Sequence, residues 1–337
     1  MRYFYCLLLS IALFQQSAVF AQSTPDASSL IKEAVQLNKD GKYAEAAGKY
    51  TDALKLDSNN IYANYGIAFS LLNCGKGDDG IPYLEKVVKS NSSITAWAYD
   101  LLGSIYDKDR NSAKAIEAFN EGIKADPKYQ RLYYNLGLVY FRDKNYGEAE
   151  KCAVQSIKLD PKHANSQRMY ALVCFHQNKR ANALLGLCSF ILLEPNTARS
   201  TEAYGNIQHI IQGGTLKADP GAPPLMVDAN TAALNQAITK AVAETGKKKY
   251  TSAGDLLTAQ LTAIFTAIGP LADTQNGDDF FKTYYADYFY KLGQTGNMAA
   301  FARMIDEADP ENAKWITEHP QYMNDLYLWI KSADRSF

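Results

Sequence analysis

The four histidines of this chain, His163, His176, His209 and His319, are scattered along the sequence. None has a second histidine or a carboxylate at the spacing of a zinc motif such as HExxH. Cys174 and His176 are two residues apart on a predicted helix, so their side chains face different ways. The sequence therefore predicts no metal site and no cofactor.

Loops that bind phosphate or calcium are not recognisable either. The chain has no GxSxG or Walker motif, and the segment Gly246 to Lys249 lacks the upstream glycine of a phosphate loop. The acidic stretch Asp273 to Asp279 contains Gly277, but Gln275 and the missing bidentate glutamate interrupt the calcium-loop pattern. An enzyme remains only an alternative, with a site assembled from distant residues of the C-terminal part.

The overall charge favours no polyanionic partner. The 337 residues include 35 Lys and Arg against 36 Asp and Glu, so the chain has no general field that would attract nucleic acid. With 47% hydrophobic residues, a chain of this length can bury one large core or two smaller ones.

The first residues resemble an export signal. Arg2 precedes the apolar run Leu7 to Phe14, and Val19 to Ala21 offers small or modest residues for a signal peptidase. The run is too short to span a bilayer, and no other segment looks apolar for long enough. We expect residues 1–21 to be removed, leaving an exported chain, periplasmic or associated with the cell envelope, without stable membrane insertion. A buried N-terminal helix is the alternative.

The remaining cysteines are Cys74, Cys152, Cys174 and Cys188. Their number is even, so disulfides are open in an oxidising compartment. Each cysteine, however, falls inside a helical apolar pattern, where a free thiol behaves as a small hydrophobe. We expect reduced thiols in the core.

Three ladders of small or turn-forming residues run through residues 27–196. They are Ala34, Ala68, Gly103, Gly137 and Ala171; Ala46, Gly80, Ala115, Ala149 and Ala183; and Ser58, Ser92, Pro127, Pro161 and Pro195. All three ladders advance by 34, 35, 34 and 34 residues. Self-similarity at such a period indicates five stacked repeat units.

Each unit is expected to be two helices joined by a tight turn. Apolar residues at spacings of three and four give each helix one buried stripe, and Gly or Ala leaves room where two helix axes come closest. Proline cannot continue a helix and restricts the residue before it. The second helix of a unit should therefore end at Asp126-Pro127, Asp160-Pro161 and Glu194-Pro195.

The third unit carries the pattern Tyr99-x-x-Leu102-Gly103-x-x-Tyr106, then Ala115-x-x-x-Phe119 and Pro127. This pattern resembles the tetratricopeptide repeat; the first unit departs from it, with Ser58 in place of the proline. The resemblance implies an all-α, right-handed solenoid of about five repeats, with a concave groove lined by the first helix of each. Members of the family usually hold peptides or partner proteins and rarely perform chemistry.

Residues beside the packing stripe of these first helices are expected to face the groove. The candidates are Trp97, Asp100, Arg131, Tyr134, Asn135, Leu138, Phe141, Arg142, Arg168, Phe175 and His176. Arg131 and Arg168 can hold a carboxylate in two parallel hydrogen bonds, and the resemblance implies that Asn135 holds a peptide backbone. We expect an extended protein or peptide segment of acidic character. A solvated face whose Arg and aromatic residues only cover one another is the alternative.

After Asn196 the repeat register is lost. Residues 197–227 are expected to hold a capping helix, Thr201 to Gln212, and a Pro/Gly-rich linker, Gly213 to Pro224, which would join the repeats to a separately folding helical domain at 228–337. Helices are expected near residues 230–244, 251–268, 277–292 and 298–308, with short ones around 315 and 329.

Aromatic residues concentrate in the predicted helix 277–292. Phe281, Tyr285 and Phe289 share one stripe, with Phe280 and Tyr284 beside it. An exposed cluster would favour a glycan-binding module of an exported uptake system. A helix apolar over most of its circumference is more typical of a core, and burial of Tyr285 and Phe289 would support that interpretation.

Overall fold

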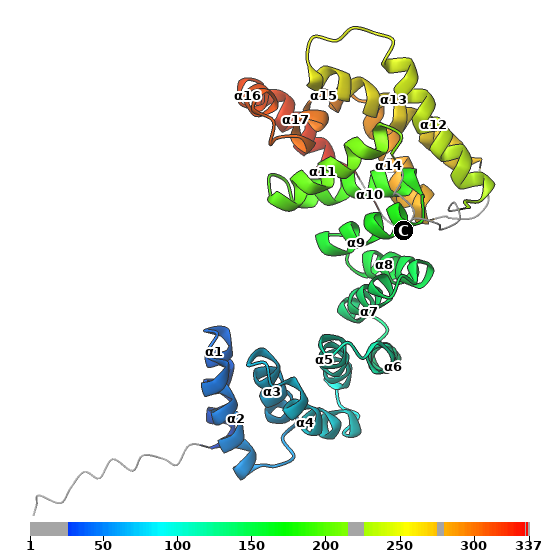
Figure 1. Ribbon diagram of the computed structural model, residues 1–337. Coiled ribbons are helices and arrows are strands. Elements are labelled where there is room, and N and C mark those ends of the chain that lie inside the picture. The colour runs from blue at the N-terminus through cyan, green and yellow to red at the C-terminus, as the bar shows by residue number, and fades with distance from the viewer. Residues whose placement is uncertain (1–25, 215–225, 275–279, 334, 336–337) are drawn as a thin grey trace, which may run out of the picture. The chain divides into compact units, whose positions relative to one another are not determined.

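The structure is a computed structural model, and it describes residues 26–214, 226–274, 280–333 and 335. Within these residues all regular secondary structure is helical (Figure 1). The predicted fold class, an all-α chain of tandem helix pairs followed by a C-terminal helical region, is confirmed. The predicted signal peptide lies outside the described residues.

The helix pairs follow the predicted period. Their helices are α1 (Ala27–Lys39), α2 (Tyr43–Leu56), α3 (Ile61–Asn73), α4 (Gly77–Lys89), α5 (Thr95–Lys108), α6 (Ser112–Ala125), α7 (Gln130–Arg142), α8 (Tyr146–Leu159), α9 (Ala164–His176) and α10 (Arg180–Leu193). Asp126 and Asp160 leave the helix in an extended conformation, and Glu194 is also non-helical. These are the residues that precede proline, so the predicted helix ends are confirmed.

The turn inside each helix pair contains one residue in the left-handed region. These residues are Gly41, Gly75, Arg110, Lys144 and Asn178, with φ between 58° and 77°. They are spaced by 34, 35, 34 and 34 residues, the same spacing as the three ladders, so the turn geometry repeats along with the helices.

The chain forms two compact units, residues 1–98 and 99–337. In the first unit, the core contains Leu30, Tyr50 and Ile67 from three different helices. Ser70 of α3 donates a hydrogen bond of 2.9 Å to the side-chain oxygen of Asn38 at the end of α1. The helices of neighbouring pairs are thus joined by apolar packing and by a polar contact.

In the second unit, the small-residue ladders mark close helix contacts. A Cβ added at Gly103 in α5 would lie 2.5 Å from the ring of Phe119 in α6. A Cβ at Gly186 in α10 would lie 3.0 Å from that of Ala171 in α9. Both distances are shorter than van der Waals contact. The prediction that small residues leave room between paired helices is confirmed.

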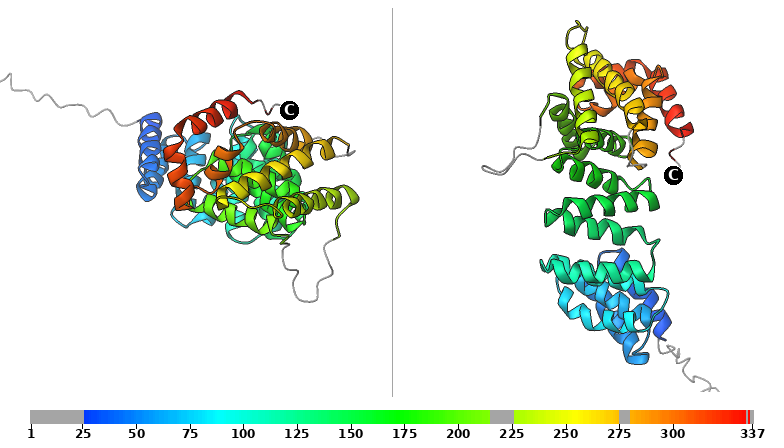
Figure 2. Two further views of the ribbon diagram at one scale, coloured as in Figure 1. Left: turned by 90° about the horizontal axis from the view of Figure 1, so that it is seen from above. Right: turned by 90° about the vertical axis from the view of Figure 1, so that its right-hand side faces the viewer.

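The C-terminal helices agree broadly with those expected. They are α11 (Ala198–Ile211), α12 (Ala229–Thr245), α13 (Ala253–Asp273), the π-helix η1 (Phe281–Ala286), α14 (Asp287–Gly293), α15 (Met298–Ile305), α16 (Pro310–Glu318) and α17 (Pro320–Ser332). Figure 2 shows α12 and α13 side by side, in agreement with the contacts between them. The π-helix was not expected.

Helix α10 joins the repeat helices to the C-terminal helices. Every residue from Arg180 to Ile191 is buried, because α10 is covered by α9 and α11 and also by α12, η1 and α15. One hydrophobic cluster extends from Ala149 to Leu326. This differs from the expectation of two separately folding regions, since residues before and after the predicted linker share a core. The predicted domain boundaries stay predictions, and residues 215–225 are outside the described part.

Helix α13 has the length and the apolar composition that a membrane-crossing helix needs. It is the one helix among the described residues that meets both criteria. This differs from the expectation that no segment after the first residues is apolar for long enough to span a bilayer. A buried core helix passes the same test, and Leu261, Ile264 and Phe265 of α13 are buried in the shared cluster.

The cysteines divide into two kinds. Cys152, Cys174 and Cys188 are buried free thiols, as the helical pattern predicts, whereas Cys74 is exposed. Cys74 is the C-cap residue of α3, so it lies just past the buried stripe of that helix. Burial raises the pKa of Cys152 to about 12, so this thiol stays protonated at neutral pH.

Candidate functional site

A hollow of about 420 Å³ lies on the face formed by α7, α9 and α11, all in the second unit. It is lined by Tyr134, Leu138, Phe141, Asn165, Arg168, Met169, Leu172 and Arg199. The floor is mainly apolar, and the two arginines supply positive charge. This hollow is the candidate site.

Helical spacing explains how these side chains come together. Tyr134, Leu138 and Phe141 are four and three residues apart, so they share one face of α7. Asn165, Arg168 and Leu172 are related in the same way on α9. Two neighbouring first helices therefore each present one face to the hollow, that of α7 mainly apolar and that of α9 mixed apolar and polar.

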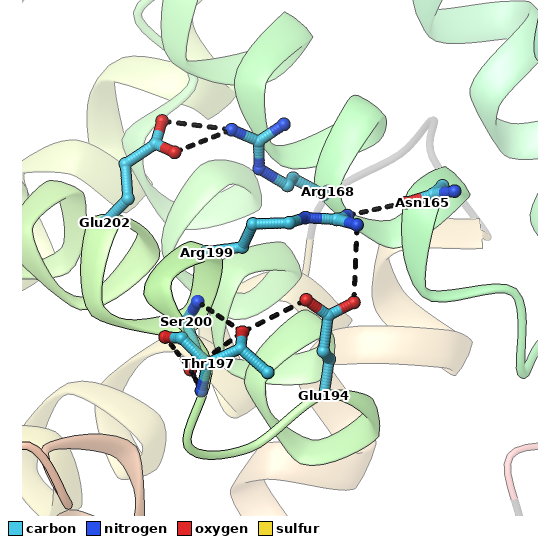
Figure 3. Close-up of polar contacts among 7 residues, drawn as sticks. All are labelled: Asn165, Arg168, Glu194, Thr197, Arg199, Ser200 and Glu202. Atoms are coloured by element: carbon cyan, nitrogen blue, oxygen red, sulfur yellow. Dashed lines mark hydrogen bonds and ion pairs between the residues drawn. The ribbon is translucent and has the colours of Figure 1, made fainter.

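Side-chain contacts across adjacent helices hold the two arginines. Arg168 donates from Nη2 to both carboxylate oxygens of Glu202, at 3.0 and 2.9 Å. Arg199 donates to Oδ1 of Asn165 at 2.5 Å, and its Nη1 lies 3.5 Å from Oε2 of Glu194 (Figure 3). In each hydrogen-bonded pair the two residues are 34 positions apart in the sequence. The pairs therefore join equivalent positions of α9 and α11.

The start of α11 fixes the position of Arg199. Thr197 and Ser200 form a capping box, in which each side chain accepts from the backbone N–H of the other residue. Thr197 also donates its hydroxyl to Glu194 at 3.0 Å (Figure 3). The cap thus orders both Glu194 and the first turn of α11.

The ion pairs at the hollow remain accessible to solvent. The side chains of Arg168 and Glu202 are 28% and 56% exposed, and that of Arg199 is 42% exposed. Ion pairs at such exposure contribute about 0–1 kcal/mol. An external carboxylate can therefore replace Glu202 on Arg168 at little energetic cost.

Arg131 and Asn135, two further predicted site residues, are engaged with Asp100. Arg131 lies with Nε 3.0 Å from Oδ2 of Asp100, and Asn135 donates to its Oδ1 at 2.7 Å. Asp100 is 2% exposed, and burial raises the pKa of its carboxyl, opposed by Arg131 and Asn135. Neither partner lines the hollow. These three residues join α5 to α7 in the structure.

The other predicted groove residues also have partners in the chain. Arg142 forms an ion pair with Asp107 and donates to Ser112 at 3.1 Å. The ring of His176 stacks on Tyr146 at a centroid distance of 4.8 Å, and burial followed by the charge of Lys144 lowers its pKa.

Phe175 and Trp97 have opposite exposures. Phe175 is 7% exposed, and its ring packs against His209 at 5.8 Å, so it belongs to the core rather than to an open surface. Trp97 lies in the first unit, where it is 43% exposed and 6.3 Å from the ring of Tyr65.

Several residues of the hollow were not among the predicted site residues. Arg199, and Glu202 that pairs with Arg168, were missed because the repeats were ended at Asn196. Asn165 and Met169 lie within the fifth repeat and were not assigned to the groove face. The signal was present: positions 199 and 202 follow 165 and 168 by one 34-residue period. Extending the period by one helix would have found both.

The aromatic residues of η1 and α14 are in the core. Tyr285 and Phe289 are fully buried. Gln167 of α9 donates to the hydroxyl of Tyr284 at 2.7 Å and accepts from that of Tyr285 at 2.6 Å. The prediction of a core helix is confirmed, and the glycan-binding interpretation loses its main support.

No group of three or more His, Cys, Asp or Glu side chains that could hold a metal ion occurs among the residues with described positions.

Two family models of repeats match segments of the chain that include α7, one of the helices that form the hollow. Residues 130–163 match the family described as "Tetratricopeptide repeat", and residues 111–144 match one described as "TPR repeat". The chain is 33% identical over 92 residues to Hsp70-Hsp90 organizing protein 3 of Arabidopsis thaliana. That match covers 27% of this chain and 16% of the relative, so the chain spans only a small part of the relative's length.

Solved structures with a similar arrangement of helices cover about half of the chain. One, from a functional characterization of Pseudomonas aeruginosa pilF, has a TM-score of 0.48 at 17% identity and covers 58% of this chain and 93% of its own. Another, YrrB, described as a TPR protein with an unusual peptide-binding site, has a TM-score of 0.43 at 19% identity and covers 53% of this chain and 92% of its own.

Proposed function

We propose that the chain is a non-catalytic protein-interaction scaffold built on tetratricopeptide repeats, on the premise that residues 111–163 match the models of such repeats. Its groove holds a partner segment in the hollow between α7, α9 and α11. The observation that carries this proposal is the combination in one hollow of an apolar floor with Arg168 and Arg199. The curated relative is named as an organizing protein for Hsp70 and Hsp90, which agrees with a scaffolding role.

The chemistry of the hollow defines the partner segment. An apolar side chain of the partner fills the space over Leu138, Phe141 and Leu172. An adjacent Asp or Glu accepts hydrogen bonds from Arg168 or Arg199, because a guanidinium matches a carboxylate in two parallel hydrogen bonds. The segment is therefore an extended peptide with an acidic residue beside a large apolar one. Arg131 and Asn135 are left to their contacts with Asp100.

Peptide display on the purified chain tests this assignment. We expect enriched peptides to carry Asp or Glu next to a large apolar residue. Arg168→Gln combined with Arg199→Gln should weaken the best such peptide by about 5–20-fold, or ~1–2 kcal/mol, because the carboxylate loses both charged donors. Titration calorimetry measures the affinity, and thermal unfolding should change little because both side chains are partly exposed.

A double variant of matched charge serves as the control. Lys124→Gln with Lys151→Gln removes two exposed cations of the same unit that do not line the hollow. Its affinity should equal that of the unaltered chain. Equal loss in both double variants would indicate general charge attraction, and no loss in either would place the binding site elsewhere.

We further propose that the chain is exported and acts in the cell envelope. The support is the order of Arg2, the apolar run Leu7 to Phe14, and the small residues Val19 to Ala21. Intact-mass analysis of the protein from its native host should show a chain that begins at Gln22. Retention of Met1 on the purified protein would contradict export by a cleaved signal.

A further inference from the structure

A second hollow, of about 1160 Å³ including the solvent at its mouth, lies beside the π-helix η1. It is lined by Pro161, Lys162, Ser189, Leu192, Leu193, Tyr284, Tyr288, Ile330, Lys331, Ala333 and Arg335. These residues come from the turn between α8 and α9, from α10, from η1 and α14, and from the end of α17. The proposed groove does not include any of them.

The guanidinium of Arg335 lies against aromatic rings and a buried hydroxyl. Its Cζ is 3.5 Å from the ring centroid of Tyr288 and 5.4 Å from those of Tyr284 and Phe289. Its Nη1 donates to Oγ of Ser189 at 2.9 Å, and Ser189 is fully buried. Cation–π contacts of this kind hold the guanidinium in place without neutralising its charge.

The hollow carries positive charge that the described residues leave uncompensated. Lys162, Lys331 and Arg335 line it, and no Asp or Glu does among the residues whose positions are described. Among the described residues, none of these three cations forms an ion pair with a carboxylate. Partial burial of a charge without a counterion is unfavourable. An anionic group in the hollow would supply the missing counterion.

The aromatic ring of Tyr284, against which Arg335 lies, is fixed in position. The hydroxyl of Tyr284 accepts from Gln167 at 2.7 Å and donates to the carbonyl oxygen of Pro161 at 3.2 Å, so the ring cannot easily turn away. Leu192 and Ile330 add aliphatic surface. Tyr284 itself lies in η1, and π-helical turns are rare and frequently found at functional sites.

We propose that this hollow binds a small amphipathic organic anion, with a carboxylate or phosphate held by Arg335 and an apolar body lying against Leu192, Leu193 and Ile330. Lys162 and Lys331 attract the anion at the rim. The enclosed part of the hollow measures about 560 Å³, which fits a ligand of this kind, since small-molecule sites usually measure about 300–1,000 Å³. This site is independent of the proposed peptide groove.

Titration calorimetry of the full chain with octanoate, octyl phosphate and octanol tests the proposal. The two anions should bind at least about tenfold more tightly than octanol, which has the same apolar body without the charge. Arg335→Gln should remove this preference, because it keeps a polar side chain of similar length but has no charge. Lys314→Gln, an exposed cation of α16 outside the hollow, should leave it intact.

Two further variants separate loss of anion binding from loss of folding and from effects on the peptide groove. If Arg335→Gln lowers the melting temperature, Lys162→Gln with Lys331→Gln replaces it, since both lysines are exposed; this pair should weaken the anions severalfold more than octanol. Arg168→Gln should leave anion binding unchanged, whatever it does to peptide binding. Octanol binding as tightly as octanoate, or anion affinity insensitive to both Arg335→Gln and the lysine pair, would overturn the proposal.

Discussion

Phe289→Ala is expected to lower the free energy of unfolding of the second unit by about 3–5 kcal/mol. Phe289 is fully buried. Its ring lies 4.9 Å from that of Phe265 and 6.0 Å from that of Phe301. Truncation to alanine removes the apolar area of a whole ring and leaves a cavity that its neighbours on α13 and α15 can only partly fill. Denaturant titration measures the loss.

The location of the effect is as informative as its size. Because α10 shares one hydrophobic cluster with α13, α14 and α15, we expect Phe289→Ala to speed amide hydrogen exchange in α10 as well. Faster exchange restricted to the helices after residue 226 would instead support a separately folding C-terminal domain. Tyr327→Ala is the control: its side chain is 53% exposed, so stability should change by less than about 0.5 kcal/mol.

The repeat helices were predictable because their signals are local. Proline after Asp126 or Asp160 prevents the helix from continuing whatever lies around it. The small residues of the ladders are equally informative, because a Cβ at Gly103 would collide with the neighbouring helix. Such constraints act on single positions, and the 34-residue period repeats them often enough to be recognised.

The shared core was not predicted, although α10 carries a signal for it. Its segment Leu184 to Ile191 is apolar around the whole circumference rather than along one stripe. A helix of that kind needs neighbours on every side. A solenoid unit at the end of a repeat array supplies them on one side only, so further helices had to cover α10. Which helices do so depends on tertiary packing, which the sequence pattern alone does not encode.

For the candidate site, the direction of the side chains was predictable and their charge partners were not. Tyr134, Leu138 and Arg168 were assigned to the groove from helical spacing, and all three line the hollow. Arg131 was assigned in the same way but pairs with Asp100 of the preceding first helix. Spacing fixes the face of one helix, whereas an ion pair also depends on how far two helices are displaced along each other.

Gly103→Ala is expected to lower the free energy of unfolding of the second unit by up to about 3 kcal/mol, in the upper part of the range for overpacked cores. The added Cβ would lie 2.5 to 2.7 Å from three atoms of the Phe119 ring. Phe119 is 1% exposed and belongs to α6, so the ring cannot make room without a shift of that helix. Thermal and denaturant unfolding of the purified variant measure the loss.

Gly205→Ala provides the matched control, because the same methyl group is added in the middle of α11 with no atom within 4 Å. There the smaller backbone entropy of alanine in the unfolded chain should raise stability by about 0.5–1 kcal/mol. The two substitutions should therefore have opposite signs. If Gly103→Ala were also stabilising, the close approach of α5 and α6 would not be what requires glycine at this ladder position. If Gly103→Ala is destabilising as expected, Phe119→Leu in the same background should restore part of the lost stability, since it removes the ring atoms that the new methyl group meets.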